Sequence, residues 1–183
     1  MVKVNYNEVR DEMRVGDVIA FSGNSVFSKL IKSVTHSDIS HVGTILSSSF
    51  VQGISLVQVI ESTSIRKGKA GVVFNRMSKH LREYDGEIFW LPLKEVMRKQ
   101  FDVGRFVNFL FAQQGKKYDM PQALGSAIDF IPDNREDLDK LFCSELVTAG
   151  FEISGLVSDI NASEQTPRDV IEFDLYDNIY QLV

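Results

Sequence analysis

The spacing of the apolar residues changes once along this chain, near residue 100, and this change limits the folds that the chain can adopt. Before it, four short segments rich in Val, Ile and Phe are separated by Ser or Gly clusters, which is typical of an antiparallel meander. These segments are His41–Ser47, Ile54–Glu61, Gly71–Asn75 and Glu87–Leu91. From Phe101 onward the apolar residues recur with a period of about 3.6, which indicates helices. We therefore expect an α+β fold, with a small antiparallel sheet and helices packed on one of its faces.

The remaining patterns predict shorter elements around this framework. A strand is expected at about Asp17–Phe21, and a helix follows over Val26–Val34, with Ser25 or Asn24 able to cap its start. The longer helices are predicted to end at glycines, because glycine readily adopts the left-handed conformation that follows a helix. The other expected elements are helices at Phe101–Gln114 and Leu141–Ser154, short helices at 78–84, near 121–130 and after Thr166, and a closing strand at Ile179–Val183.

The composition suits one domain covering residues 1–183, since 44% of the residues are apolar types and can supply a sizeable core. The formal net charge is -5, with Lys and Arg scattered among Asp and Glu, so neither nucleic acid nor an anionic membrane surface is an expected partner. No stretch approaches the roughly 18 apolar residues of a membrane span, and the N-terminus has no apolar leader. We expect a soluble, cytoplasmic protein without a membrane span, and the oligomeric state stays open.

Cys143 is the single cysteine of the chain, which excludes an internal disulfide and a cysteine-rich zinc site. Neither a metal nor a cofactor is expected. One interpretation is packing, because free cysteines are often buried and Cys143 shares a helix face with Leu146, Val147 and Gly150.

The other interpretation of Cys143 is reactivity, because the exposed N–H groups at a helix start stabilise a thiolate. This interpretation depends on where the helix begins: Asp137 or Asp139 could cap an earlier start, whereas Glu145 suits the first turn of a helix that begins near Cys143. A reactive cysteine also needs a base, so the histidines decide between the two.

Three histidines could take up a proton from the thiol. His36 lies in a polar loop and His80 lies beside Lys79 and Arg82, so both are expected to be solvated surface residues. His41 opens an apolar strand, where a side chain is held rigidly. A hydrogen-bonded structural histidine is the alternative interpretation of this position.

The hairpin predicted around Val51 connects His41 to an acidic residue. If His41–Ser47 pairs with Ile54–Glu61, opposed residue numbers sum to about 102, which places His41 opposite Glu61 on one face of the sheet. Glu61 could then hydrogen-bond the imidazole and fix its tautomer and orientation. Alternatively, Glu61 ends its strand at the solvent, and a register slip of one residue would move it to the other face.

Five short motifs, taken in order, resemble those of a known family. They are Gly16-Asp17-Val18-Ile19, Ser40-His41-Val42-Gly43, Val59-Ile60-Glu61, Lys117-Tyr118-Asp119 and Phe142-Cys143-Ser144-Glu145. The set resembles the permuted branch of the NlpC-type papain-like cysteine hydrolases, which is related to the lecithin retinol acyltransferase group. In that branch the histidine strand precedes the cysteine helix, as it does here. The resemblance runs from about Val15 to Asp169 and implies a permuted papain-like fold.

The resemblance also implies roles for individual residues. Cys143 would be the nucleophile, His41 the base and Glu61 the residue that orients the histidine, although the third position varies across the wider superfamily. The backbone N–H of Cys143 would contribute to an oxyanion hole at its helix start.

Further residues in the same motifs are candidates for substrate binding, namely Tyr118, Ser40 and Ser144. Tyr118 resembles the aromatic residue near the site of these enzymes, and a buried structural tyrosine is the equal alternative. Asp17 resembles a residue that fixes a turn, so we expect a structural role for it.

The implied activity is that of a cysteine peptidase or amidase, which cleaves an amide bond through a thioester on Cys143 without a cofactor. The expected substrate is a small peptide, a cell-wall-type peptide or an N-acyl amino acid. Two alternatives stay open. One is a catalytically idle papain-like domain that binds a ligand in the same groove. The other is a lipid acyl hydrolase or acyltransferase, which usually has a membrane anchor or a basic interfacial helix, neither of which we find in the sequence.

Overall fold

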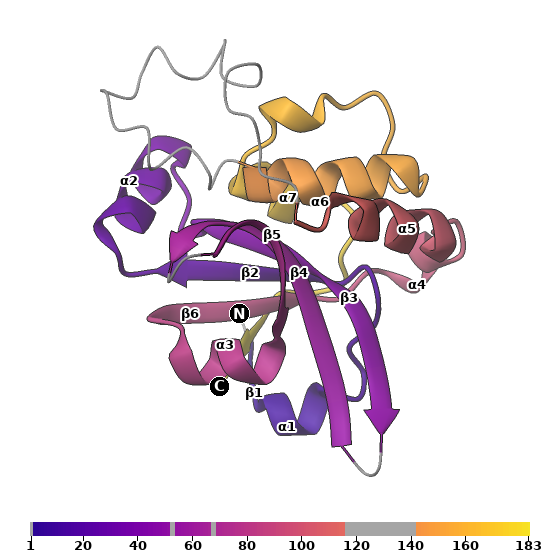
Figure 1. The fold of residues 1–183 in the computed structure, drawn as a ribbon, viewed down its shortest axis with the longest axis horizontal. Coiled ribbons are helices and arrows are strands. Elements are labelled where there is room, and N and C mark those ends of the chain that lie inside the picture. Colours follow the sequence, from indigo (N-terminus) through magenta and orange to yellow (C-terminus); the bar gives the residue numbers. More distant parts are fainter. Residues whose placement is uncertain (1, 52–53, 67–68, 116–141) are drawn as a thin grey trace.

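The computed structural model describes residues 2–51, 54–66, 69–115 and 142–183. In this part of the chain a seven-stranded sheet has the order β1-β7-β6-β2-β3-β4-β5 (Figure 1). Its strands are β1 (Val2–Val4), β2 (Val18–Gly23), β3 (His41–Val51), β4 (Ile54–Arg66), β5 (Lys69–Arg76), β6 (Gly86–Leu91) and β7 (Tyr180–Leu182). The four strands of the predicted meander and the strands at both ends of the prediction are therefore present, and the α+β class is confirmed.

The helices also follow the predicted order. They are α1 (Tyr6–Val9), α2 (Val26–Thr35), α3 (Met77–Glu83), α4 (Glu95–Arg98), α5 (Val103–Gln113), α6 (Phe142–Ile153) and α7 (Pro167–Glu172), with a 3₁₀ helix at Ala162–Glu164. The helix predicted near 121–130 lies outside the described residues. The sequence patterns missed β1, α1, α4 and the 3₁₀ helix, because elements of three or four residues carry almost no periodicity.

Two details of the predicted architecture are wrong. The sheet is mixed, because β1 and β7 pair in parallel. Helices also cover both faces and not one: α5, α6 and α7 lie on one side of the sheet, and α3 lies on the other (Figure 1). The reason is visible in the strands, where neighbours such as Val59 and Ile60 are both buried, each in a different apolar cluster. A strand that is apolar on both faces needs cover on both faces.

Local signals at the helix ends are confirmed. The Ser25 hydroxyl accepts a hydrogen bond from the Ser28 N–H and caps α2. Gly155 follows α6 with a φ of +79°, in the left-handed region that favours glycine. Thr166 and Asp169 form a reciprocal capping box at the start of α7. These caps fix where α6 and α7 begin or end relative to the sheet.

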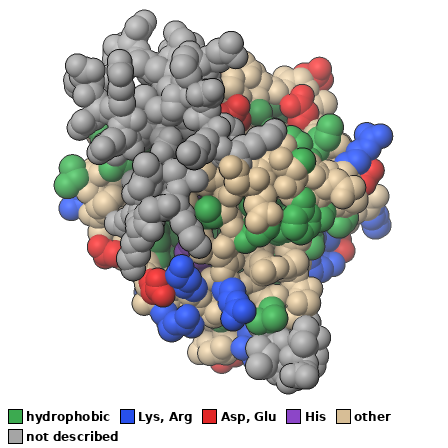
Figure 2. All heavy atoms as spheres, viewed as in Figure 1, with side chains coloured by type: hydrophobic (Ala, Val, Ile, Leu, Met, Phe, Trp, Pro, Cys, Tyr) green, Lys and Arg blue, Asp and Glu red, His purple; other side chains and the backbone are tan. Residues whose placement is uncertain are grey.

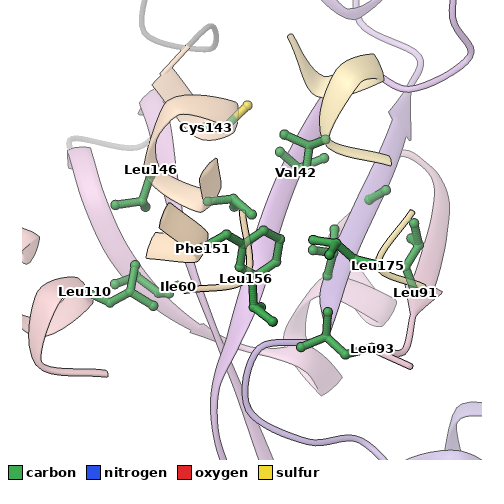
Figure 3. Packing of buried hydrophobic residues seen from close by; sticks show 14 of the residues in the cluster. Val42, Ile60, Leu91, Leu93, Leu110, Cys143, Leu146, Phe151, Leu156 and Leu175 are labelled. Carbon is green, nitrogen blue, oxygen red and sulfur yellow. The ribbon is translucent and has the colours of Figure 1, made fainter. Parts of the chain in front are cut away.

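Helix α6 is held close to α5 by a glycine. A Cβ built at Gly150 would lie 2.8 Å from the Phe106 ring, which is too close for any larger residue without movement. The rings of Phe106 and Phe151 stack beside it. Leu146 and Leu110 lie in this part of the core, together with Phe151 (Figure 3). The buried face of α6 therefore positions its first turn, which carries Cys143.

The surface carries charges of both signs. In Figure 2, Lys and Arg side chains (blue) and Asp and Glu side chains (red) lie around the periphery of this face, with an apolar area between them. None of the helices in the described residues is both long enough and apolar enough to cross a membrane.

Candidate active site

Cys143 is the second residue of α6 and is completely buried. It belongs to the apolar cluster that contains Leu146 and Val147, so the packing interpretation of this residue is correct as far as it goes. Its sulfur, however, projects from the first turn of the helix, away from Leu146 (Figure 3). At this position the backbone N–H groups have no partner within the helix and favour a negative charge nearby.

His41 is the first residue of β3 and is paired with Phe21 in β2. Its side chain is 12% exposed, and its ring lies 5.3 Å from the Phe21 ring, measured between centroids. Because a strand end and an aromatic ring hold the imidazole, its two nitrogens have defined directions. Nε2 lies 2.7 Å from Glu61 Oε2, which leaves Nδ1 for the opposite side of the ring.

The Cys143 thiol lies within hydrogen-bonding reach of the His41 ring. Helix α6 packs across β3 and β4, and this packing brings its first turn to the start of β3. Nε2 of His41 is occupied by Glu61, and buried Nδ1 has no partner of full hydrogen-bond geometry among the described residues. Loose contacts of this kind are common between a nucleophile and its base when no substrate is bound.

The surroundings of His41 favour its charged form. Burial alone would lower the pKa of His41, but the charge and hydrogen-bonding capacity of Cys143, followed by those of Glu61, raise the pKa to about 10. This pKa describes an imidazolium in contact with the Glu61 carboxylate. A charged histidine beside a cysteine is a proton donor placed at the reacting sulfur.

Glu61 reaches His41 because of an irregularity in the hairpin. Thr44 pairs with Ile60, whereas Ser47 pairs with Gln58, so one extra residue is inserted in β3 between these pairs. Without this bulge Glu61 would be opposite Thr44 and on the other face from His41. The register predicted from the sequence was therefore two residues off, and His41 and Glu61 are diagonal neighbours on one face.

Gly43 makes room for this diagonal contact. The pair after Thr44 and Ile60 brings Gly43 opposite Glu61, and a Cβ at Gly43 would lie 3.2 Å from the Glu61 Cβ and 2.9 Å from Val59. With no side chain at this point, the Glu61 carboxylate can cross to the imidazole. The glycine after the histidine in the Ser-His-Val-Gly motif thus has a steric reason.

The second oxygen of the Glu61 carboxylate has two partners of its own. Asn75, which lies on β5, donates a hydrogen bond of 2.6 Å from Nδ2 to Oε1. His80, which lies on α3, places Nε2 at 2.9 Å from the same oxygen. The prediction that His80 is a solvated surface residue is wrong: its side chain is only 14% exposed and packs edge-on against Phe21. No periodic signal in the sequence links a short helix to a particular strand residue, so this contact could not be predicted.

The histidines determine the ionisation of Glu61. Burial alone would raise the pKa of this carboxyl group. The hydrogen bond and charge of His41, together with the short contact and charge of His80, outweigh burial and hold the pKa well below its usual range. Glu61 is thus a buried anion that is enclosed by donors. The alternative that Glu61 merely ends its strand at the solvent is excluded.

The predicted substrate-binding residues have different surroundings. Ser40 is buried, and its hydroxyl accepts from the Gly23 N–H and donates to the Phe21 carbonyl, which ties the start of β3 to β2. Ser144 is buried as well, and its hydroxyl donates to the Gln165 carbonyl at 2.6 Å. These bonds position the segments that carry His41 and Cys143, and substrate contact by either serine stays a prediction. Tyr118 lies outside the described residues.

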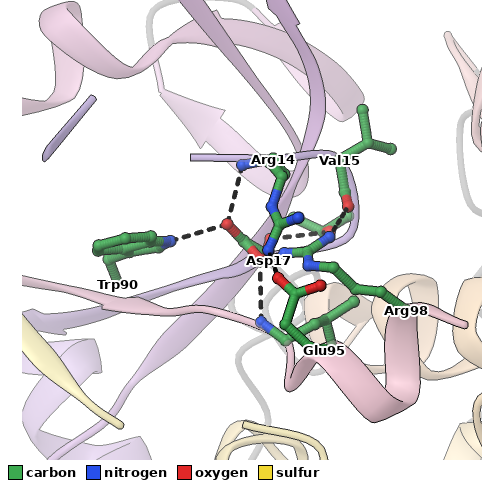
Figure 4. A network of polar contacts seen from close by, with 8 residues as sticks. Arg14, Val15, Asp17, Trp90, Glu95 and Arg98 are labelled. Atoms are coloured by element: carbon green, nitrogen blue, oxygen red, sulfur yellow. Dashed lines mark hydrogen bonds and ion pairs between the residues drawn. The ribbon is translucent and has the colours of Figure 1, made fainter. Parts of the chain in front are cut away.

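Asp17 has the structural surroundings expected of it. Its buried carboxylate accepts hydrogen bonds from the backbone N–H groups of Arg14 and Leu93 and from the Trp90 indole, and it pairs with Arg98 (Figure 4). Burial raises the pKa of this carboxyl group, and the Arg98 guanidinium opposes that shift. The network joins the turn before β2 to the segment after β6.

The residues that the structure describes contain no cluster of three or more His, Cys, Asp or Glu arranged to hold a metal ion. What they do contain is a sulfur at a helix start, an imidazole beside it and a buried carboxylate on the far nitrogen. This order of groups can activate a thiol, return a proton to a leaving group and stabilise the imidazolium in between.

Comparisons with known proteins add information on the fold. No family model and no curated protein sequence matches the chain. A solved structure that resembles it is the metalloprotein yiiX from Escherichia coli O157:H7, described as DUF1105, with a TM-score of 0.50 and 20% sequence identity. The match covers 78% of this chain and 66% of the length of that protein. At this identity, the chain is similar to that protein in fold alone.

Proposed function

We propose that this protein is a cysteine hydrolase with a permuted papain-like fold, in which Cys143 is the nucleophile, His41 the base and Glu61 the residue that orients the histidine. The observation that carries the proposal is the continuous contact from the thiol to the buried carboxylate through one imidazole. Its support is that three residues from α6, β3 and β4 converge, with donors and acceptors in the order that the chemistry requires.

The proposed reaction begins with attack of the Cys143 thiolate on an amide carbonyl carbon. A C–S bond forms while the carbonyl electron pair moves to oxygen, where the Cys143 backbone N–H is a donor. His41 then gives its proton to the leaving amine, and the C–N bond breaks to leave a thioester. Water attacks the thioester as His41 takes up a proton, and cleavage of the C–S bond releases the acid and restores the thiolate.

Glu61 has a supporting part in this scheme. The 2.7 Å contact to Nε2 directs Nδ1 toward Cys143, so the imidazole is presented in one tautomer when it is neutral. When the imidazole is charged, the carboxylate stabilises it. The peptide or N-acyl amino-acid substrate and the cytoplasmic location stay predictions of the sequence.

Covalent capture tests the proposal directly. The wild-type protein is incubated with short peptides and N-acyl amino-acid amides, and intact mass spectrometry is used to detect an acyl adduct that hydroxylamine removes. Because the chain has one cysteine, a thioester on this protein must be at Cys143. We expect the adduct in the wild type and none in Cys143→Ala.

Val147→Ala is the matched control, because Val147 is equally buried on the same helix and lacks a role in the scheme. It is expected to lose stability through a small cavity while it still forms the adduct. If Cys143→Ala turns over a substrate at the wild-type rate, the proposal is wrong. Adducts formed only from phosphatidylcholine vesicles would indicate a lipid acyl hydrolase, and ligand binding without turnover would indicate an idle domain.

A further inference from the structure

The Glu61 carboxylate contacts two histidines through different oxygens. Oε2 contacts His41, the proposed base, whereas Oε1 lies 2.9 Å from His80 Nε2. His80 has no part in the proposed reaction. Its position beside the same buried carboxylate nevertheless links it to the base.

His80 is held in this position by its own helix. Met77, the first residue of α3, is completely buried and anchors the helix against β4 and β5. One turn later the His80 ring meets the Phe21 ring at a centroid distance of 5.1 Å and an angle of 62°. The same Phe21 ring contacts His41, so the two imidazoles share an aromatic wall as well as a carboxylate.

The contact between His80 and Glu61 depends on charge more than on direction. Although Nε2 and Oε1 are 2.9 Å apart, the ring N–H is not aligned for a hydrogen bond. Asn75 provides the aligned donor to Oε1 instead, at 2.6 Å. A short, misaligned approach to a buried carboxylate is favourable when the imidazole is charged, because the attraction between opposite charges does not require alignment.

Charge balance supports the same conclusion. When Cys143 is ionised, as the proposed reaction requires, the thiolate, the His41 imidazolium and the Glu61 carboxylate together carry one uncompensated negative charge in a buried site, which is costly. A charged His80 would make the cluster neutral. The other charged groups on and beside α3 are exposed and screened by water, so they compensate poorly; they are Arg76, Lys79, Arg82 and Glu83.

We propose that His80 is a positioning residue, which as an imidazolium binds Glu61 Oε1 so that Oε2 stays directed at His41. The inference rests on the proposed function for its catalytic meaning, but the charge coupling exists independently of any substrate. Loss of the His80 charge would raise the pH at which each remaining group of the cluster releases its proton, because one positive charge is removed from its surroundings.

The test uses the pH dependence of Cys143 alkylation by iodoacetamide, which needs no substrate and reports on one cysteine. The variants are His80→Gln, which removes the charge, and His80→Lys, which keeps one. His36→Asn is the control, because His36 is exposed and in the left-handed conformation that asparagine tolerates. We expect the acid limb of the profile to move up by roughly half a unit to one unit in His80→Gln.

The profile of His80→Lys is expected to stay closer to the wild-type profile than the profile of His80→Gln does. The profile of the control, His36→Asn, should coincide with the wild-type profile. A measurement on the unaltered protein supports the variants: ¹⁵N NMR at pH 7 should show both His80 ring nitrogens protonated. A neutral His80 in that spectrum, an unshifted His80→Gln profile, or equal shifts in the Gln and Lys variants would overturn the inference.

Turnover separates this inference from the proposed function. With a substrate in hand, His80→Gln is expected to lower kcat about 10-fold with little change in KM, because orientation and not ground-state binding is disturbed. A shifted alkylation profile in a protein that turns over nothing would support the role of His80 and contradict the hydrolase. An active enzyme in which His80→Gln leaves the alkylation profile unshifted would support the hydrolase and contradict the role of His80.

Discussion

The molecule contains two buried carboxylates that look alike in their burial and differ in their partners. Asp17 is 0% exposed and Glu61 is 4% exposed. Asp17 is bound by a guanidinium, an indole and two backbone amides, none of which gains or loses a proton near neutral pH. Glu61 is bound by two imidazoles and a side-chain amide, and an imidazole is a group that can change its charge by gaining or losing a proton.

The pKa values of the two acids follow this difference. Burial raises the pKa of Asp17 in spite of the Arg98 charge, whereas the histidines lower the pKa of Glu61 in spite of burial. Partners that cannot titrate give a fixed tie between chain segments. Partners that can titrate allow the charge around a carboxylate to change. In the described residues the carboxylate with such partners is Glu61, whose partner His41 contacts the cysteine. The following predictions separate the two cases.

The largest effect is expected at the nucleophile. Cys143→Ala should lower turnover by at least about 10³-fold, because no thioester can form without the sulfur. Its melting temperature should fall only slightly, since the cavity left by one sulfur is small. Activity assays and thermal unfolding on the same preparation check this. A variant that loses stability yet retains activity would make Cys143 a core residue only.

A stability effect, and no specific effect on chemistry, is expected at Asp17. Asp17→Asn leaves the Arg98 guanidinium without its counter-charge, and the expected loss is about 3–5 kcal/mol in the free energy of unfolding. Urea denaturation measures this, and iodoacetamide labelling of the folded fraction should keep the wild-type pH profile. Glu95→Gln, which removes an exposed pair with Arg14, is the control and should change little. A shifted labelling profile in Asp17→Asn would show that the two carboxylates are coupled.

The opposite pattern is expected at Glu61. Glu61→Gln should also lower turnover, but its fold reduction should be about 100 times smaller than that of Cys143→Ala. The reason is that an imidazole with a weaker partner still samples the productive geometry. The variant should lose mainly kcat, and its pH profile should shift. Steady-state kinetics across pH check this. If Glu61→Gln reduces stability alone and leaves the profile unchanged, Glu61 belongs with Asp17 as a structural acid.

The smallest effect is the pH dependence of stability. The folded-state pKa of Glu61 is lowered, so its contribution is present above the unfolded value and is lost as pH falls. The pKa of His41 is raised from 6.5 to about 10, so its contribution is full below pH 6.5 and is lost as pH rises toward 10. The stability difference between wild type and Glu61→Gln should therefore peak in mildly acid solution. Urea denaturation from pH 3 to 10 measures it, and a difference that is constant with pH would contradict the assignment.

Much of the framework could be predicted from the sequence. The strands and longer helices follow from apolar periodicity, and the caps at Ser25, Gly155 and Thr166 follow from local chemistry. These features depend on residues a few positions apart, which is why the sequence expresses them directly. The pairing of β3 with β4 was also predictable, because a short hairpin leaves few alternatives.

The site depends on the tertiary structure in two respects. The sequence by itself predicted a helix that contains Cys143 and a strand that begins at His41, since both depend on local patterns. The bulge in β3 decided on which face Glu61 lies, because one inserted residue reverses every side chain beyond it. The packing of α3 decided that His80 is a buried partner and not a surface residue, since helix docking depends on contacts between distant segments that no local pattern records.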